Sequence, residues 1–217
     1  MKPDLAALRA AVLEFGGYDR PDRSWTEWTL ATAPSVDLSL LAHRRALHRW
    51  LNAWGCRIRY PRAGEAEVFD QGVADWWERW RGRLPSVDTW MADLTDEQVE
   101  AMGDCFADLV STPAAQARSV RGLGSTAASK ALFALRPNTV MPWDEMIALR
   151  LHGARDGAAY AAHLGLGRTW ARDLLVESGL DEPALAEDLG RPGRSLAKMI
   201  DEYCYLRFTR DGAVTVG

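Results

Sequence analysis

The sequence predicts an all-α fold, a multi-helix bundle in two lobes with a small C-terminal β-hairpin. Three observations support this prediction. Apolar side chains recur at every third or fourth position through most of the chain, as they do in helices that bury one face. Residues that commonly cap helices stand in front of several of these segments. Only the tail alternates between apolar and polar residues in the way that strands do.

The helical pattern divides into about ten segments. An amphipathic helix is predicted at residues 1–15. Ser35 is placed to cap a helix that Gly55 ends, and Thr95 and Gln98 form a capping box ahead of another helix. The remaining helices are predicted at 68–81, 125–135, 143–151, 168–178, 183–189 and 194–206. Two tail strands are expected at 205–209 and 214–216, around a turn at 211–212.

Length and composition indicate one globular domain. Of the 217 residues, 47% are apolar and 26% are charged, which is enough to bury a core and keep a solvated surface. We expect a single domain at 1–217 with two helical lobes, at about 1–110 and 111–217. No apolar run approaches the roughly 18 to 20 residues of a membrane span. Arg9 and Glu14 interrupt the region where an export signal would be apolar. A cytoplasmic protein is therefore expected, with no membrane partner, and the excess of Arg over Lys indicates a bacterial one.

The cysteines and histidines predict neither a metal site nor a cofactor. The three cysteines are far apart in the sequence and form no CxxC pair. His43 and His48 are five residues apart, which is wrong for a shared face of one helix. The chain also has no phosphate loop and no dinucleotide fingerprint.

The charges are unevenly distributed, although the net charge is only −4. Residues 38–64 contain no Asp or Glu, and Arg44, Arg45 and Arg49 there are predicted to lie on one basic helix face beside Trp50. Such a face suits a nucleic-acid backbone. The alternative is an ordinary solvated face that balances the acidic segment 84–117.

A glycine-containing segment at 120–130 carries the most specific pattern. Gly122 and Gly124 flank one apolar residue, which permits a tight turn between two short helices. The predicted fold therefore includes a helix-hairpin-helix motif. The backbone N–H groups of this turn, with Ser125 and Thr126 at the start of the next helix, are predicted to hold a backbone phosphate. A plain packing turn is the alternative.

Here the chain resembles the helix-hairpin-helix DNA glycosylase superfamily. The resemblance covers residues 120–151: the glycine hairpin, a helix, a loop containing Pro142, and Asp144 opening the next helix. It implies that Asp144 is the catalytic aspartate, because a carboxylate can stabilise the positive charge that develops on the sugar or orient the attacking water. The family's lyase members carry a lysine where this chain has Thr126, so the resemblance implies a monofunctional enzyme.

Two neighbours extend this candidate site. Lys130 lies one helical turn beyond Thr126 and could still reach the site as a catalytic residue. Trp143 adjoins Asp144 and is a candidate wall of the pocket that would hold an extruded base. The alternatives are that Asp144 only caps a helix, that Lys130 is solvated or contacts a phosphate, and that most of the ten tryptophans are core residues.

Three functions therefore remain open at the level of the sequence. The first is a monofunctional DNA glycosylase that hydrolyses the N-glycosidic bond of a damaged or modified base. The second is a non-catalytic nucleic-acid-binding module of the same fold. The third is a helical domain that binds a protein or a small molecule. DNA is the expected partner under the first two, whereas the sequence does not address the oligomeric state.

Overall fold

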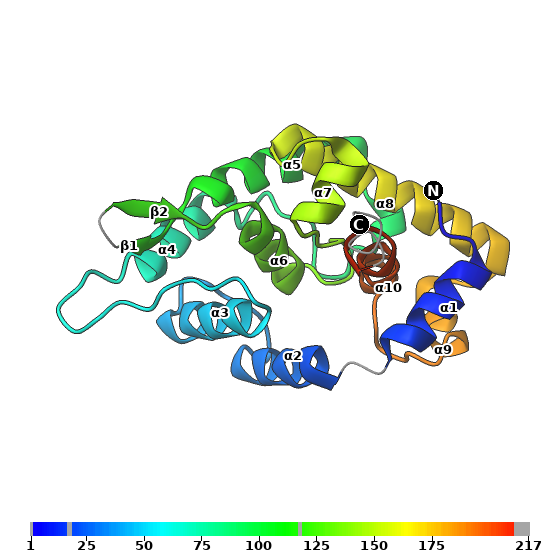
Figure 1. The fold of residues 1–217 in the computed structure, drawn as a ribbon, viewed down its shortest axis with the longest axis horizontal. Coiled ribbons are helices and arrows are strands. Elements are labelled where there is room, and N and C mark those ends of the chain that lie inside the picture. The colour runs from blue at the N-terminus through cyan, green and yellow to red at the C-terminus, as the bar shows by residue number, and fades with distance from the viewer. Residues whose placement is uncertain (1, 17–18, 117–118, 211–217) are drawn as a thin grey trace, which may run out of the picture.

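The computed structural model describes residues 2–16, 19–116 and 119–210, and it is mainly helical, which confirms the predicted fold class (Figure 1). Within these residues the order of elements is α1 (Leu5–Phe15), α2 (Asp19–Ala31), α3 (Leu41–Ala53), α4 (Val68–Trp80), the 3-10 turn η1 (Met91–Asp93), α5 (Asp96–Ser111), β1 (Pro113–Gln116), β2 (Val120–Gly122), α6 (Ser125–Leu135), α7 (Glu145–His152), α8 (Gly157–Ser178), α9 (Glu182–Asp188), α10 (Leu196–Cys204) and the π-helix η2 (Tyr205–Arg210). None of the helices among these residues is long and apolar enough to cross a membrane.

Side-chain caps fix the start of several helices, as the sequence predicts. Thr95 and Gln98 form the expected capping box at α5. The carboxylates of Asp144, Asp156 and Asp181 accept hydrogen bonds from the first-turn N–H groups of α7, α8 and α9. These caps set the directions in which the helices leave their loops.

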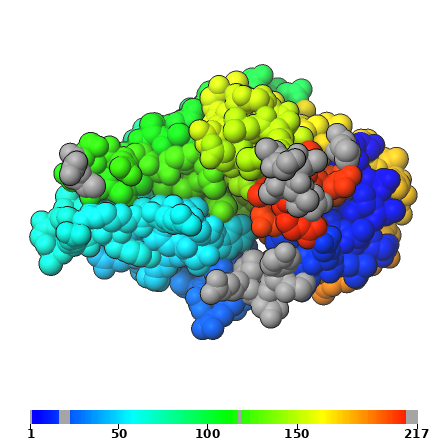
Figure 2. Space-filling view, viewed as in Figure 1, coloured from blue at the N-terminus to red at the C-terminus, as the bar shows by residue number. Residues whose placement is uncertain are grey.

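The helices pack as two groups around α6 and α10. Figure 1 shows α2 and α3 on one side of the molecule and α5 with α8 on the other. The N-terminal helix α1 packs against α10 and α8, so that α1 (blue) and α10 (red) lie side by side in Figure 2. The most extensive helix pair is α5 with α8, which lie on either side of the predicted division near residue 110.

Two glycines allow α5 and α8 to approach closely. A Cβ atom at Gly103 would lie 2.8 Å from the carbonyl oxygen of Gly157, and one at Gly157 would lie 2.7 Å from the carbonyl oxygen of Gly103. Only residues without a side chain fit at this crossing. The contact fixes α8, and through it the two helices that α8 supports, α7 and α10.

The structure corrects the predicted start of the third helix. It begins at Leu41 rather than at Ser35, because the preceding turn is held by the helix's own side chains. The ring Nδ1 of His43 accepts from the N–H of Asp37 at 3.0 Å, and the guanidinium of Arg44 donates to the carbonyls of Leu38 and Ser39. Helix α2, at Asp19–Ala31, has no counterpart among the predicted helices.

The small hairpin lies elsewhere than predicted. Strands β1 and β2 form an antiparallel pair between α5 and α6, whereas Tyr205–Arg210 forms a π-helix instead of the first tail strand. The second predicted tail strand, 214–216, lies outside the described residues. The segment directly before Gly122 is therefore a strand, and the predicted helix-hairpin-helix is here helix, β-hairpin and helix, with α5 and α6 still in contact.

Candidate functional site

A cavity of about 360 Å³ brings the main sequence candidates together. It lies where the end of α3, the middle of α6, the start of α7 and helix α10 meet, a region near the centre of Figure 1. Asp144, Lys130 and Trp143 all line it, whereas Thr126 is not among its lining residues. The remaining lining residues are Phe15, Ala53, Trp54, Gly55, Pro142, Ile147, Lys198, Asp201 and Tyr205. The volume lies within the usual range for small-molecule sites, about 300 to 1,000 Å³.

Asp144 caps helix α7 and faces the cavity as well. Its Oδ1 accepts from the N–H of Ile147 at 2.9 Å, which satisfies the capping alternative. Its Oδ2 accepts from the hydroxyl of Thr209 in η2 at 2.7 Å. A carboxylate offers about four acceptor positions, so these two hydrogen bonds leave acceptor capacity on Asp144, which lines the cavity.

Lys130 reaches the same cavity from α6. Its Nζ donates to the carbonyl oxygen of Trp54 at 2.7 Å and lies 5.8 Å from the centre of the Trp54 ring. The side chain is half-buried, so it is not a freely solvated surface lysine. The thiol of Cys56 lies close to this charge, although burial is the dominant influence and raises the pKa of that thiol.

Trp143 supports the cavity more than it lines it. Its ring is only 1% exposed and packs edge-on against Phe106 and Tyr160 at 5.4 and 5.1 Å. Its indole N–H donates to the hydroxyl of Ser125, and its backbone N–H donates to the hydroxyl of Ser129. The two serines of α6 thereby hold the loop that presents Asp144.

Lys198 and Asp201 of α10 line another part of the wall and belong to a buried charged cluster. The ammonium of Lys198 pairs with Oδ2 of Asp201 at 2.7 Å and lies 3.5 Å from Oε1 of Glu202. Arg191 approaches the same glutamate oxygen at 3.5 Å. Burial is the largest influence on both carboxyls, and it raises the pKa of Asp201 and of Glu202. Lys198 is also within 4.8 Å of the Phe15 ring centre.

The glycine turn offers fewer donors than predicted. The N–H groups of Leu123 and Gly124 already donate to the carbonyls of Thr112 and Val110, so Gly124 has no N–H free for a phosphate. Gly122 is required for close packing, since a Cβ there would lie 2.7 Å from the carbonyl oxygen of Val110. The first-turn N–H groups of Ser125 and Thr126 have no acceptor among the described residues, because no side chain caps α6.

The predicted basic face is mostly occupied by internal contacts. Arg44 holds the turn before α3, and Arg45 pairs with Glu67 and Asp70 at 3.8 and 3.5 Å. Glu67 and Asp70 lie outside the acidic segment 84–117, which the alternative interpretation expected to balance this basic face. Of the three arginines, Arg49 alone is exposed without a hydrogen bond or ion pair to a described residue.

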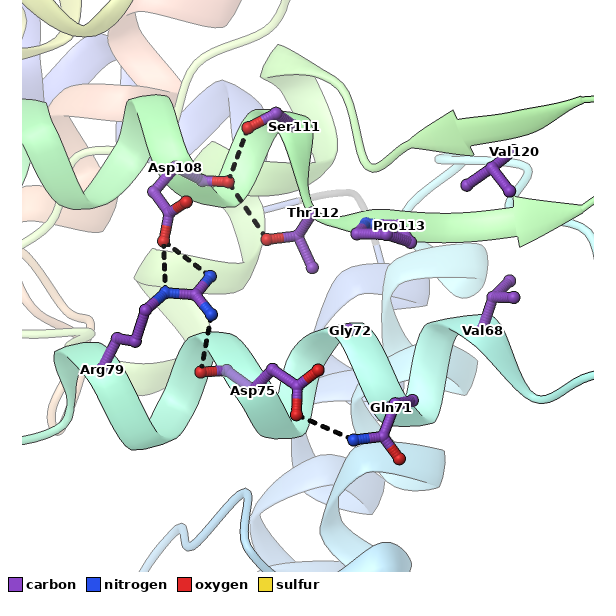
Figure 3. A pocket seen from close by; sticks show the side chains of 10 residues that line it. All are labelled: Val68, Gln71, Gly72, Asp75, Arg79, Asp108, Ser111, Thr112, Pro113 and Val120. Carbon is purple, nitrogen blue, oxygen red and sulfur yellow. Dashed lines mark hydrogen bonds and ion pairs between the residues drawn. The ribbon is translucent and has the colours of Figure 1, made fainter.

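A second cavity, of about 330 Å³, lies between α4, the end of α5 and the β-hairpin (Figure 3). Its polar side chains bind one another. The guanidinium of Arg79 donates to the carboxylate of Asp108 and to the carbonyl of Asp75, and Gln71 donates to the carboxylate of Asp75. None of the sequence-predicted site residues lines it.

The lining side chains that sequence reasoning did not single out include Trp54, Lys198 and Asp201. One signal was available for the lysine. The chain has 26 basic residues, of which only Lys2, Lys130 and Lys198 are lysines, and two of these three line the cavity. The aromatic signal was diluted, because seven of the ten tryptophans are buried core residues.

Comparison with protein-family models, with curated proteins and with solved structures found no match for this chain. The function is therefore inferred from the geometry of the cavity.

Proposed function

We propose that this protein is a monofunctional DNA glycosylase-like enzyme that hydrolyses the bond between a damaged or modified base and its deoxyribose. One observation carries the proposal. Asp144 and Lys130, which the sequence singles out on two different helices, line one cavity that has aromatic walls. An enzyme that acts on an extruded base needs a carboxylate beside a pocket that can enclose a planar ring.

The proposed chemistry centres on Asp144. As the glycosidic bond lengthens, positive charge develops on the sugar, and a carboxylate held at fixed geometry stabilises that charge without reorganising. The hydrogen bonds from Ile147 and Thr209 hold both carboxylate oxygens in place. A water molecule that donates to Asp144 would be oriented to attack the sugar carbon and would give its proton to the carboxylate.

Lys130 has an electrostatic role in this proposal. Its ammonium is anchored by the Trp54 carbonyl at 2.7 Å, at the wall of the cavity. From there a positive charge can attract the phosphate beside the target nucleotide, or stabilise the departing base as it gains negative charge. The open N–H groups of Ser125 and Thr126 supply a second phosphate contact on the same helix.

Base release from damaged and mismatched duplexes, measured by mass spectrometry, tests the proposal. The wild type should release at least one base, and Asp144→Asn should lower the rate by about a hundred-fold or more. Asp156→Asn is the matched control, because Asp156 caps α8 as Asp144 caps α7 but does not line the cavity. Asn caps helices as well as Asp does, so both variants should fold.

Equal losses in Asp144→Asn and Asp156→Asn would contradict a catalytic role for Asp144. If no duplex releases a base, the proposed glycosylase activity is contradicted.

A second candidate, a small-molecule-binding domain, is favoured by one observation. Arg44 and Arg45 are engaged internally, which leaves a small exposed basic face for a DNA backbone. A nucleoside-sized ligand needs the cavity but no such face. Salt dependence separates the two: DNA binding should weaken with a log–log slope near −0.9 per phosphate contact, whereas binding of a neutral small molecule should barely respond.

A further inference from the structure

Lys198 and Asp201 form an ion pair that is buried and yet borders the cavity. The two side chains are 5% and 12% exposed, and both line the cavity wall. They lie three residues apart on α10, so they face the same side of that helix. Burying a charged pair costs more free energy than burying apolar side chains of similar size, so such a pair is weak evidence for stability alone.

The pair leaves one donor and one acceptor unused. An ammonium has three N–H donors. The ammonium of Lys198 has two acceptors nearby, Oδ2 of Asp201 at 2.7 Å and Oε1 of Glu202 at 3.5 Å, so one donor remains. Oδ1 of Asp201 accepts no hydrogen bond from a described residue. This oxygen is also not fully enclosed by protein atoms. A donor and an acceptor therefore stand side by side at the cavity wall.

The Trp54 side of this wall disfavours a positively charged ring. The ammonium groups of Lys198 and Lys130 lie 5.5 and 5.8 Å from the centre of the Trp54 ring. A positively charged ring stacked on Trp54 would meet two like charges. A neutral ring with an electron-rich carbonyl oxygen would instead gain a charge-assisted hydrogen bond from an ammonium.

We infer that Lys198 and Asp201 form a base-recognition subsite that selects neutral nucleobases carrying a ring carbonyl next to a ring N–H. The carbonyl oxygen accepts from the ammonium of Lys198, and the ring N–H donates to Oδ1 of Asp201. Phe15, Trp54 and Tyr205 supply apolar surface around the ring. The inference rests on the proposed function for its class of ligand and adds which bases that site takes.

Bases with an amino group next to a ring nitrogen present the opposite order of donor and acceptor. When the sugar fixes the orientation of the ring, their amino group faces the ammonium of Lys198 and their ring nitrogen faces Asp201. Both protein groups then lose their partners, and this loss is the usual physical source of strong discrimination in a binding site.

Binding of 2′-deoxynucleosides, measured by calorimetry and by saturation-transfer NMR, tests the subsite without requiring catalysis. Deoxyinosine is compared with deoxyadenosine, and deoxyuridine with deoxycytidine, because each pair shares its sugar and ring size and differs in this edge. In the pair whose ring size fits, the wild type should prefer the carbonyl member by about ten-fold or more. Lys198→Met should reduce that preference to within about two-fold.

Two variants make the result specific. Lys2→Met is the control, since Lys2 pairs with Asp173 on the surface, and it should leave the preference unchanged. Asp201→Asn is the second test, because its amide can also donate to a ring nitrogen; it should lower the preference even if Lys198→Met folds poorly.

The subsite is overturned if the wild type binds no nucleoside, if it binds both members of each pair equally, or if the preference survives in both Lys198→Met and Asp201→Asn. These outcomes are separable from the fate of the proposed function. Base release from duplexes with no nucleoside preference would retain the glycosylase and reject the subsite. A preference that depends on Lys198, without base release from any duplex, would retain the subsite and reject the glycosylase.

Discussion

The hydroxyl of Thr209 donates a 2.7 Å hydrogen bond to Oδ2 of Asp144, across 65 residues of sequence. Thr209 belongs to the π-helix η2, which continues α10 and packs against α7. The candidate catalytic carboxylate is therefore held from both sides, by its own helix through Ile147 and by the C-terminal segment through Thr209. This arrangement makes the end of the described chain part of the site.

Replacing Thr209 should slow base release by loosening Asp144. Thr209→Val keeps the shape of the side chain and removes the donor, and we expect kcat to fall by about ten-fold with little change in KM, because the carboxylate keeps only its contact with Ile147. Thr209→Ser restores the hydroxyl and should recover most of the rate. The measurement is the rate of base release over a range of substrate concentrations, which gives both constants.

Thr169→Val is the control for this experiment, since its exposed hydroxyl donates to a carbonyl within α8. A rate for Thr209→Val that equals the wild type would show that Ile147 alone positions Asp144.

Glu182 should make stability depend on pH. Burial raises the pKa of its carboxyl to about 7 from an ordinary 4.5. A hydrogen bond from the N–H of Ala92 favours the charged form and opposes this rise, but its effect is smaller. The folded protein therefore binds more protons than the unfolded chain between these values, and stability should fall as the pH rises from about 4.5 to 7. The full effect is up to about 3 kcal/mol.

Glu182→Gln should remove this dependence. The variant should be more stable than the wild type at pH 8, and the two should differ little at pH 5, where the wild-type carboxyl is largely protonated. Urea unfolding at both pH values provides the measurement, with Glu187→Gln on the exposed face of α9 as the control. A stability difference that does not change with pH would contradict the assignment.

The crossing of α5 and α8 should not tolerate a side chain at Gly103. Gly103→Ala would place a Cβ 2.8 Å from the carbonyl of Gly157, so the helices must separate, at a cost of about 1 to 3 kcal/mol. Gly165→Ala on α8 is a sharp control, because its Cβ would meet only Val99, at 4.0 Å. That variant should gain up to about 1 kcal/mol from helix propensity. Thermal melts that ranked the two in the opposite order would refute the close approach.

Arg49 should account for a DNA contact that Arg44 and Arg45 do not provide. Arg49→Ala should weaken duplex binding and reduce the log–log salt slope by about 0.9, since one phosphate contact is lost. Arg45→Ala should leave the slope nearly unchanged, because Arg45 is already paired with Glu67 and Asp70. Fluorescence anisotropy at several salt concentrations gives both slopes. Equal slopes for all three proteins would place the DNA elsewhere.

The sequence by itself determined the local features of this protein. Helical periodicity and caps located most helices, and the Thr95 capping box and the Asp144 cap are where they were predicted. These features depend on contacts between residues three or four positions apart, and such contacts are visible in a sequence. The pattern at 120–151 that resembles a glycosylase motif singles out Asp144, with Lys130 and Trp143 as its neighbours, and all three line the main cavity.

Only the tertiary structure decided which residues meet. The alternation at 205–209 resembles a strand, yet this segment forms a π-helix, because it continues α10 and packs on α7 and its Thr209 reaches Asp144. Arg44 and Arg45 look available in the sequence and are engaged internally in the fold. Trp54, Lys198 and Asp201 come from the end of α3 and from α10, which are distant in sequence and meet at one cavity. These contacts between distant residues arise from the packing of apolar helix faces over the whole chain. A local sequence pattern shows that a helix has an apolar face, but not which other helix that face packs against.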